Sequence, residues 1–320
     1  MIALASFQDL YVGLEPYANE KQIGGGVLRK TAPAVFGLLA ALELHPTNTK
    51  CGVFAPVGGF RQVSESMFHL CQDCGVKFMF DASVTQVNDK GVHMLSRVDQ
   101  DKQNVHFLQA DLIICNADLS FASKTIMTSK DAKKEIYDWD DRFDFSTGVL
   151  AFHWSVSRKL ASLNTHNVFM SAKSKADAEK SWSVLRHDAD HLSQEFTSNT
   201  PFNFYVHRAS KTDATAAPPS CDSIMVLVPC IPLRRHENVA SMSKAEAIDM
   251  YSEQFNSEMV SSVREAVFDR LAAVEGLQDL EEHIIHEVID TPSTYANYYN
   301  VGAGVPFGLV RNQACCFKLF

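Results

Sequence analysis

The amino-acid sequence predicts a mixed α/β protein, with an α/β layer in its first part and an α+β arrangement in its second. Three observations support this prediction. A helical pattern over 61–74 is followed by strand patterns that extend to residue 115. From residue 148 onward, β-rich runs alternate with polar stretches. A long apolar stripe at helical spacing then occupies residues 248–267.

The first part begins with a helix followed by strands. Apolar side chains recur at spacings of 4, 3 and 4 at Val63, Met67, Leu70 and Cys74, which predicts a packed helix. Gly75 is typical of the residue that ends a helix. We expect strands over 76–87, 91–95, 105–108 and 110–115. Because the last of these is continuously apolar, it favours a sheet covered on both faces.

A glycine pair precedes this helix, at the end of the apolar run 52–60. Gly58 and Gly59 permit positive φ angles and lack the Cβ atoms that would hold a backbone away from a flat ligand. The run therefore predicts a turn that a cofactor approaches closely. An ordinary surface turn is the alternative.

The second part combines strands with one long helix. Runs over 148–154, 167–170, 202–206 and 223–228 predict an antiparallel sheet. Residues 243–246 have the form of a capping box, which predicts that a helix over 243–274 begins there and buries its apolar stripe. After an expected strand at 284–289, Thr291 and Pro292 predict the N-cap and first residue of a short helix.

Composition excludes several classes of protein. The 320 residues are 46% apolar and 21% charged, as in globular proteins. A net charge of −9 gives no basic surface for nucleic acid. The apolar run over 32–42 is shorter than the roughly 20 residues that span a bilayer, so it predicts a buried or interfacial helix.

The motifs identify no metal site and no catalytic group. The histidines are scattered, and the lone Cys71-Gln72-Asp73-Cys74 predicts reduced thiols on a packed helix. His153, His207 and His286 lie inside strand patterns, where structural histidines are expected. The glycine clusters at 24–26 and 302–308 lack the spacing of phosphate-binding loops. The catalytic residues stay unassigned.

A family resemblance emerges from the order of these motifs. Segments 6–13, 32–36, 52–59, 116–118, 204–208, 216–218, 290–292 and 302–309, taken in order, resemble the middle of bacterial- and fungal-type phytoene desaturases. The resemblance implies a flavoprotein of the amine-oxidase-like group, with FAD as cofactor and a hydrophobic polyene as substrate. The implied reaction desaturates a carotenoid precursor such as phytoene, an oxidation of CH–CH groups by hydride transfer to the flavin.

The resemblance also implies a domain organisation and a set of site residues. Residues 51–125 correspond to a partial FAD/NAD(P)-binding, Rossmann-like domain, whereas 1–50 and 126–320 correspond to the substrate domain. The implied cofactor-binding residues are Pro56, Gly58, Gly59, Val84, Asn116 and Ala117. The family further implies peripheral membrane association, with a plastid or an endomembrane as the compartments considered.

Two segments of the family pattern are absent from these 320 residues, namely the opening G-x-G-x-x-G and the closing flavin-binding segment. We therefore expect a fragment with an exposed sheet edge and poor FAD binding on its own. Two alternatives stay open. One is a related FAD oxidoreductase acting on another lipid, similar to a retinoid saturase, and the other is a non-catalytic protein that binds an apolar ligand or serves as a scaffold.

Overall fold

The computed structural model describes residues 55–96, 105–127, 143–145, 148–170, 174, 202–230, 232–233, 253, 255–306 and 309–311. The segments 6–13 and 32–36, the apolar run at 32–42, the glycines at 24–26 and the capping box at 243–246 lie outside these residues.

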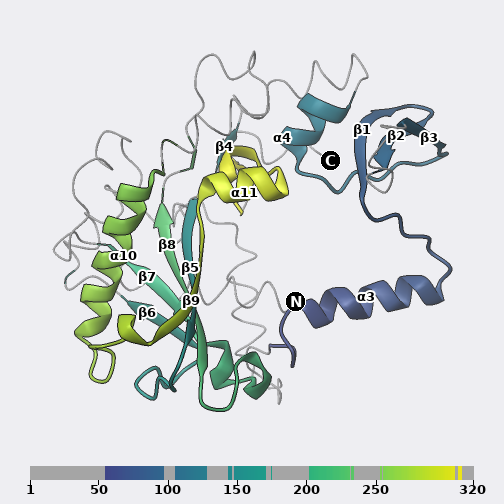
Figure 1. Cartoon of the computed structure of the whole chain (residues 1–320). Coiled ribbons are helices and arrows are strands. Elements are labelled where there is room, and N and C mark those ends of the chain that lie inside the picture. Colours follow the sequence, from purple (N-terminus) through teal and green to yellow (C-terminus); the bar gives the residue numbers. More distant parts are fainter. Residues whose placement is uncertain are drawn as a thin grey trace, which may run out of the picture.

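A five-stranded antiparallel sheet forms the centre of the second part, in the order β6-β7-β8-β5-β9 (Figure 1). Its strands are β5 (Gly148–Val156), β6 (Asn167–Met170), β7 (Phe204–His207), β8 (Asp222–Cys230) and β9 (Ile284–Asp290). Neighbouring strands pair antiparallel throughout. The antiparallel sheet predicted from the β-rich runs is confirmed, and with it the mixed α/β class.

Helix α10 (Ser257–Ala272) covers one face of this sheet (Figure 1). Its buried residues are Val260, Val263, Ala266, Val267 and Leu271. They pack in one core cluster with the strand residues that alternate toward this face, among them Phe152, Trp154, Phe204 and Val226. The predicted core role of the apolar stripe is therefore confirmed at Phe255, Val263 and Val267, and Met259 packs partly buried against the same cluster. Ile248 and Tyr251 of the stripe lie outside the described residues.

The prediction of one helix over 243–274 is wrong, because the helix begins at Ser257. Phe255 lies in a turn, and Asn256 is extended, with a ψ of 165°. The Asn256 side chain accepts a hydrogen bond from the Met259 amide at 2.9 Å, so that it caps the helix. A local cap inside the stripe decided where the helix starts, and the apolar spacing alone could not show it.

Strands β1 (Ala82–Asn88), β2 (Gly91–Ser96) and β3 (Val105–Gln109) form a separate antiparallel meander. Beside it lie α4 (Leu119–Phe121) and the π-helical turn η4 (Ala122–Ile126), linked to β1 by a parallel bridge between Val87 and Met127. A second small sheet pairs β4 (Phe143–Phe145) with β10 (Leu309–Arg311). The strands predicted over 91–95 and 105–108 are confirmed.

Two predicted strand segments do not form strands. Residues 76–80 precede β1 and residues 110–115 follow β3, and neither segment is hydrogen-bonded to a neighbouring strand. Leu112 and Ile114 are 78% and 84% exposed. An apolar run becomes a strand only when a neighbouring strand accepts and donates its backbone hydrogen bonds. Within the described ranges, no strand pairs with these two runs.

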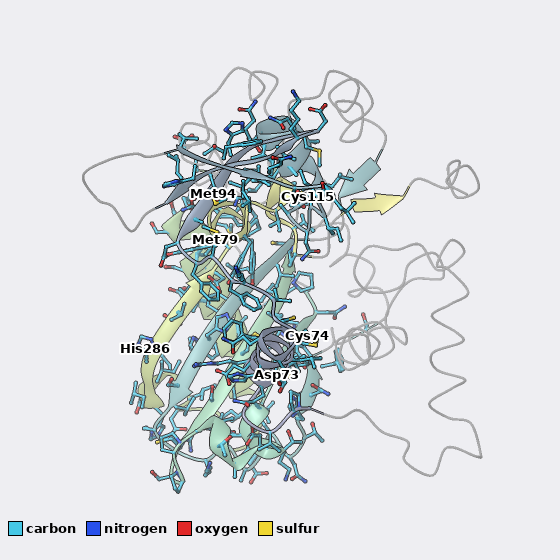
Figure 2. The ribbon with its side chains drawn as sticks, turned by 90° about the vertical axis from the view of Figure 1, so that its right-hand side faces the viewer. Asp73, Cys74, Met79, Met94, Cys115 and His286 are labelled. Atoms are coloured by element: carbon cyan, nitrogen blue, oxygen red, sulfur yellow. The ribbon has the colours of Figure 1, made fainter. Side chains whose placement is uncertain are left out.

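Helix α3 (Arg61–Asp73) confirms the predicted helix and its end. Gly75 has a φ of 79°, and the amides of Gly75 and Val76 donate to the carbonyls of Gln72 and Cys71, which is a Schellman motif. The prediction that this helix is packed is wrong, because none of its residues is buried. The thiols of Cys71 and Cys74 are free, as predicted, and Cys74 lies exposed beyond the end of the helix (Figure 2).

Short helices complete the described part. Helix α11 (Pro292–Tyr299) has Thr291 as N-cap and Pro292 in its first turn, as predicted. The 3₁₀ turns are η5 (Ala209–Lys211), η6 (Ala214–Ala216), η8 (Glu281–His283) and η9 (Gly302–Gly304). Turns η5 and η6 follow β7 directly, so that they connect the sheet to the site described next.

Candidate functional site

The glycine pair forms the turn that the sequence predicts. The Gly59 amide donates to the Pro56 carbonyl at 3.0 Å, and Gly58 and Gly59 have φ angles of 84° and 81°. L-residues with a Cβ atom rarely adopt such angles, so both positions favour glycine for their backbone conformation. We call residues 56–59 the glycine turn. It leads directly into α3.

The two glycines of this turn have different surroundings. A Cβ atom on Gly58 would lie 2.9 Å from Cγ of Gln62, whereas a Cβ atom on Gly59 would meet no atom within 4 Å. The Gly58 amide donates to Oδ2 of Asp213 at 2.6 Å. At Gly58 the position of a Cβ atom is therefore blocked by Gln62 and the amide is bound by Asp213, whereas the same position at Gly59 is open. Of the two, Gly59 is the position that a flat ligand could approach closely.

The other predicted site residues lie in the unit built from β1 to η4. Val84 is exposed in β1, opposite Met94 of β2. Asn116 and Ala117 are exposed just before Asp118, whose side chain accepts from the Phe121 amide at 3.1 Å and caps α4. Figure 2 places the labelled Met94 and Cys115 in this same unit.

The structure thus arranges the predicted site residues in two groups. The glycine turn lies at the N-terminal end of α3, and the chain reaches β1 only after the other end of that helix (Figure 1). With 13 residues in α3, the helix is about 20 Å long. Val84, Asn116 and Ala117 form one group and Pro56, Gly58 and Gly59 the other. That one cofactor contacts both groups stays a prediction.

The five-stranded sheet has a second face, opposite α10, which we call the open face. Its side chains alternate with those of the core; those of β6, β7 and β8 and His153 of β5 are half-buried, whereas Val149 and Ala151 of β5 are buried. Cross-strand neighbours on this face are His153 with Met225, Leu227 with Tyr205, and Tyr205 with Phe169. The rings of Phe169 and Tyr205 lie 5.2 Å apart. Across β6, β7 and β8 the open face therefore presents apolar and aromatic groups, next to polar ones such as Asn167 and His207.

One ionisable pair lies on the open face. His153 Nε2 is 3.2 Å from Oδ2 of Asp290, and the two side chains are 40% and 27% exposed. Burial, together with the charge of Asp290, raises the pKa of nearby Tyr295 to about 12, so this phenol is neutral at physiological pH. The sequence predicts that His153 lies in a strand, but it does not indicate that Asp290, 137 residues away, is its partner.

A buried ionic cluster fixes η5 against the sheet. The fully buried Asp222 carboxylate lies 2.8 Å from the guanidinium of Arg208. It also accepts hydrogen bonds from Ser210 Oγ at 2.7 Å and from the Leu160 amide at 2.6 Å. Burial by itself raises the pKa of Asp222, but these hydrogen bonds and the charge of Arg208 outweigh it and lower the pKa.

A histidine pair lies where β7 ends, next to Arg208. His166 and His207 face each other through their Nε2 atoms, and the Nδ1 atom of His166 contacts Thr212 Oγ1 at 2.5 Å. Burial and, secondarily, the charge of His166 lower the pKa of His207 to about 4. His207 is therefore neutral near pH 7. His153, His207 and His286 all lie in strands, as predicted, and His286 is labelled on β9 in Figure 2.

Neither a metal centre nor a membrane span is found in the described part of the chain. Its residues include no cluster of three or more His, Cys, Asp or Glu side chains able to hold a metal ion. None of its helices combines the length and apolar character needed to cross a bilayer.

Fold and site together define a mixed α/β protein in which an antiparallel sheet has one helix-covered face and a second face with half-buried apolar and aromatic side chains. Comparison with known proteins adds a more particular likeness. The chain is 26% identical to the phytoene desaturase of Phycomyces blakesleeanus over 313 residues, which are 95% of this chain and 44% of that protein. It is also 26% identical to the zeta-carotene-forming phytoene desaturase of Myxococcus xanthus, over 97% of this chain and 50% of that protein.

More distant relatives extend this likeness. The 4,4'-diapophytoene desaturase (4,4'-diaponeurosporene-forming) of Staphylococcus aureus is 23% identical over 97% of this chain and 53% of its own length. The chain thus spans about half the length of the curated relatives it matches. The resemblance to phytoene desaturases is confirmed as a similarity along nearly the whole chain. No protein-family model matches it.

Among solved structures, an oxidoreductase from Methanosarcina mazei is similar to this chain with a TM-score of 0.45 and 12% identity, over 91% of this chain and 53% of the other.

Proposed function

We propose that this chain is part of a flavin-dependent oxidoreductase that desaturates a carotenoid precursor such as phytoene. The observation that carries the proposal is the similarity to phytoene desaturases from fungi and bacteria over at least 95% of the chain. FAD as cofactor, the polyene substrate and peripheral membrane association all belong to this proposal. Two features of the chain support it, namely the glycine turn and the open face.

The glycine turn fits a flat cofactor at one of its two glycines. At Gly59 a Cβ atom would stand in open space, so the absence of this atom leaves room for a ring system against the backbone. Pro56, Gly58 and Gly59 would hold the flavin side of the group, and Val84, Asn116 and Ala117 would hold its other parts. When bound, FAD supplies a two-electron acceptor for a hydride that leaves a CH–CH unit.

The open face suits a hydrocarbon chain as substrate. A polyene offers no hydrogen-bonding group, so it is held by apolar contact and by the exclusion of water. Met225, Leu227, Tyr205 and Phe169 form a half-buried surface of this kind across three neighbouring strands.

His153 is the group on this face that suits the second part of the reaction. Desaturation removes a hydride from one carbon and a proton from its neighbour. When the Nε2–H of neutral His153 donates to Asp290, the lone pair at Nδ1 is left to accept that proton. Asp290 then stabilises the imidazolium that forms.

The function is tested with the complete reading frame of the transcript that encodes this chain, expressed in cells that accumulate phytoene. We expect ζ-carotene, neurosporene or lycopene to appear. Unchanged phytoene beside folded, flavin-loaded protein would contradict carotenoid desaturation and favour another lipid substrate. A transcript confined to these 320 residues, yielding protein without flavin, would favour the non-catalytic binding or scaffold alternative.

The same expression system tests His153. His153→Gln is expected to lower product formation by about 100-fold, the size of effect typical for the loss of a general base. The control is His286→Gln. His286 is an exposed histidine of β9, and it pairs with Ser155, which follows His153 by two positions in β5. Equal activity of the two variants would contradict the assignment of His153.

A further inference from the structure

The glycine turn is held by a residue from a distant part of the chain. Asp213 lies between η5 and η6 and is buried, with 9% of its surface exposed. Its Oδ2 atom accepts the Gly58 amide at 2.6 Å, across 155 residues of sequence. This contact joins the glycine turn to the part of the protein that contains the five-stranded sheet.

The two carboxylate oxygens of Asp213 have separate roles. Oδ1 accepts from the amide and the hydroxyl of Thr215 at 2.9 and 2.6 Å, so that it caps η6 locally. Oδ2 reaches the glycine turn. The hydrogen bonds from Thr215 and from the Gly58 amide lower the pKa of Asp213 and outweigh the opposing effect of burial. The carboxylate is therefore ionised at physiological pH.

Helix α3 lacks the negative charge that helix N-termini favour. Its N-cap residue Phe60 makes no side-chain cap, and its first turn contains no acidic residue. The Asp213 carboxylate contacts the turn that immediately precedes α3. A negative charge near this end also interacts favourably with the helix dipole.

Asp213 is itself firmly anchored. The preceding turn η5 is bound to β8 through Ser210, whose hydroxyl donates to Asp222 at 2.7 Å, and Arg208 beside it forms the buried ion pair with Asp222. The Gly59–Pro56 hydrogen bond fixes the shape of the glycine turn, but it cannot fix the orientation of the turn relative to the sheet. The contact from Asp213 can.

We propose that Asp213 is the positioning residue of the glycine turn. Its carboxylate holds the turn in one orientation relative to the five-stranded sheet, and so sets which way the unobstructed side of Gly59 points. What approaches Gly59 rests on the proposed function. The positioning itself does not, because it follows from the contacts of Asp213 alone.

Hydrogen exchange of the full 320-residue chain, measured by mass spectrometry on peptides that cover residues 55–61, tests the proposal. Asp213→Ala removes the acceptor and is expected to speed exchange of the Gly58 amide at least tenfold. Thr215→Ala is the matched control, because it removes only the Thr215 hydroxyl contact and is expected to leave this exchange within twofold of wild type. Asp213→Asn replaces one oxygen by a donor, so an intermediate increase is expected.

The outcomes separate cleanly. Wild-type exchange of Gly58 in both Asp213 variants overturns the proposal, and so does an equal increase in Thr215→Ala, which would mark the contact as local capping only. If Asp213→Ala speeds exchange in every peptide, that variant has unfolded and Asp213→Asn decides instead. An increase in Asp213→Asn that is confined to residues 55–61 supports the proposal, and one that extends to every peptide overturns it. If exchange responds as expected but FAD affinity of the complete protein is the same in Asp213→Asn and wild type, the positioning stands and the flavin assignment of the turn fails.

Discussion

The five-stranded sheet with α10 and the region from 55 to 119 contain similar apolar residues, but they differ in how far those residues are buried. In the sheet, Phe152, Val226 and Val267 are completely buried. In residues 55–119, Phe80 and Leu112 are 69% and 78% exposed. Both regions carry apolar periodicity, but among the described residues of 55–119 Met94 is the one large apolar side chain that is buried, whereas the sheet with α10 buries a whole cluster.

The difference shows what an apolar pattern specifies. A stripe on a helix or strand is stabilised by about 25 cal/mol for each Å² of apolar surface that another element covers. Helix α10 finds this cover on the sheet, whereas α3 has no buried residue in the described structure. The sheet with α10 is therefore expected to determine the stability of the chain, and the next five predictions test this contrast.

The largest effect is expected at Asp222, in the sheet region. Asp222→Ala leaves Arg208 buried without its carboxylate partner, and the loss of one partner from a buried ion pair costs about 3–5 kcal/mol. Urea unfolding followed by circular dichroism measures this cost. A loss below about 1 kcal/mol would contradict the role of this cluster.

The same cluster predicts a pH dependence. Because the folded pKa of Asp222 is lower than its unfolded pKa of about 3.9, the unfolded chain binds more protons in this range. Its stabilisation is present above pH 4 and is lost as the pH falls through the lowered folded pKa. Asp222→Asn is the control, since it removes this titration while keeping the volume of the side chain.

A matched pair of leucines compares the two helices directly. Leu271 on α10 is fully buried, and Leu271→Ala is expected to cost about 2–5 kcal/mol through lost burial and the cavity that remains. The measurement is the shift in urea midpoint at constant slope. A cost close to zero would mean that α10 is not part of the core.

A smaller effect is expected at the start of α10. Asn256→Ala removes the side chain that accepts from the Met259 amide, at a cost of about 1 kcal/mol. Asn256→Ser keeps a capping oxygen and is expected to restore most of this stability. If both variants equal wild type, the helix does not begin at Ser257.

The smallest effect is expected at Leu70 on α3, the counterpart of Leu271. Leu70 is 56% exposed, so Leu70→Ala is expected to change the free energy of unfolding by no more than about 0.5 kcal/mol. The same urea titration measures it. A loss as large as that at Leu271 would show that α3 packs against another part of the protein and would remove the contrast between the two regions.

The local features of the fold could be predicted from sequence. The end of α3 at Gly75, the cap of α11 at Thr291 and the positive φ angles of Gly58 and Gly59 all agree with the structure. Each depends on residues within one or two turns of one another. The family resemblance could also be recognised from the sequence, because it rests on the order of motifs along the chain.

The long-range features could not be predicted. Residues 76–80 and 110–115 read as strands but lack a pairing strand in the described structure, and the stripe of α3 reads as packed but is not buried. The pairing of His153 with Asp290 depends on the register between β5 and β9. No local pattern encodes such a register between distant strands.

The positions of turns, helix caps and alternating strands, and the family resemblance, follow from the amino-acid sequence alone, because they depend on neighbouring residues or on the order of motifs. Which apolar stripe is buried, and that Asp213 binds the Gly58 amide 155 residues away, became visible only in the folded chain. Burial and long-range hydrogen bonds need a second surface, and the position of that surface follows from the packing of the whole sheet rather than from any one segment.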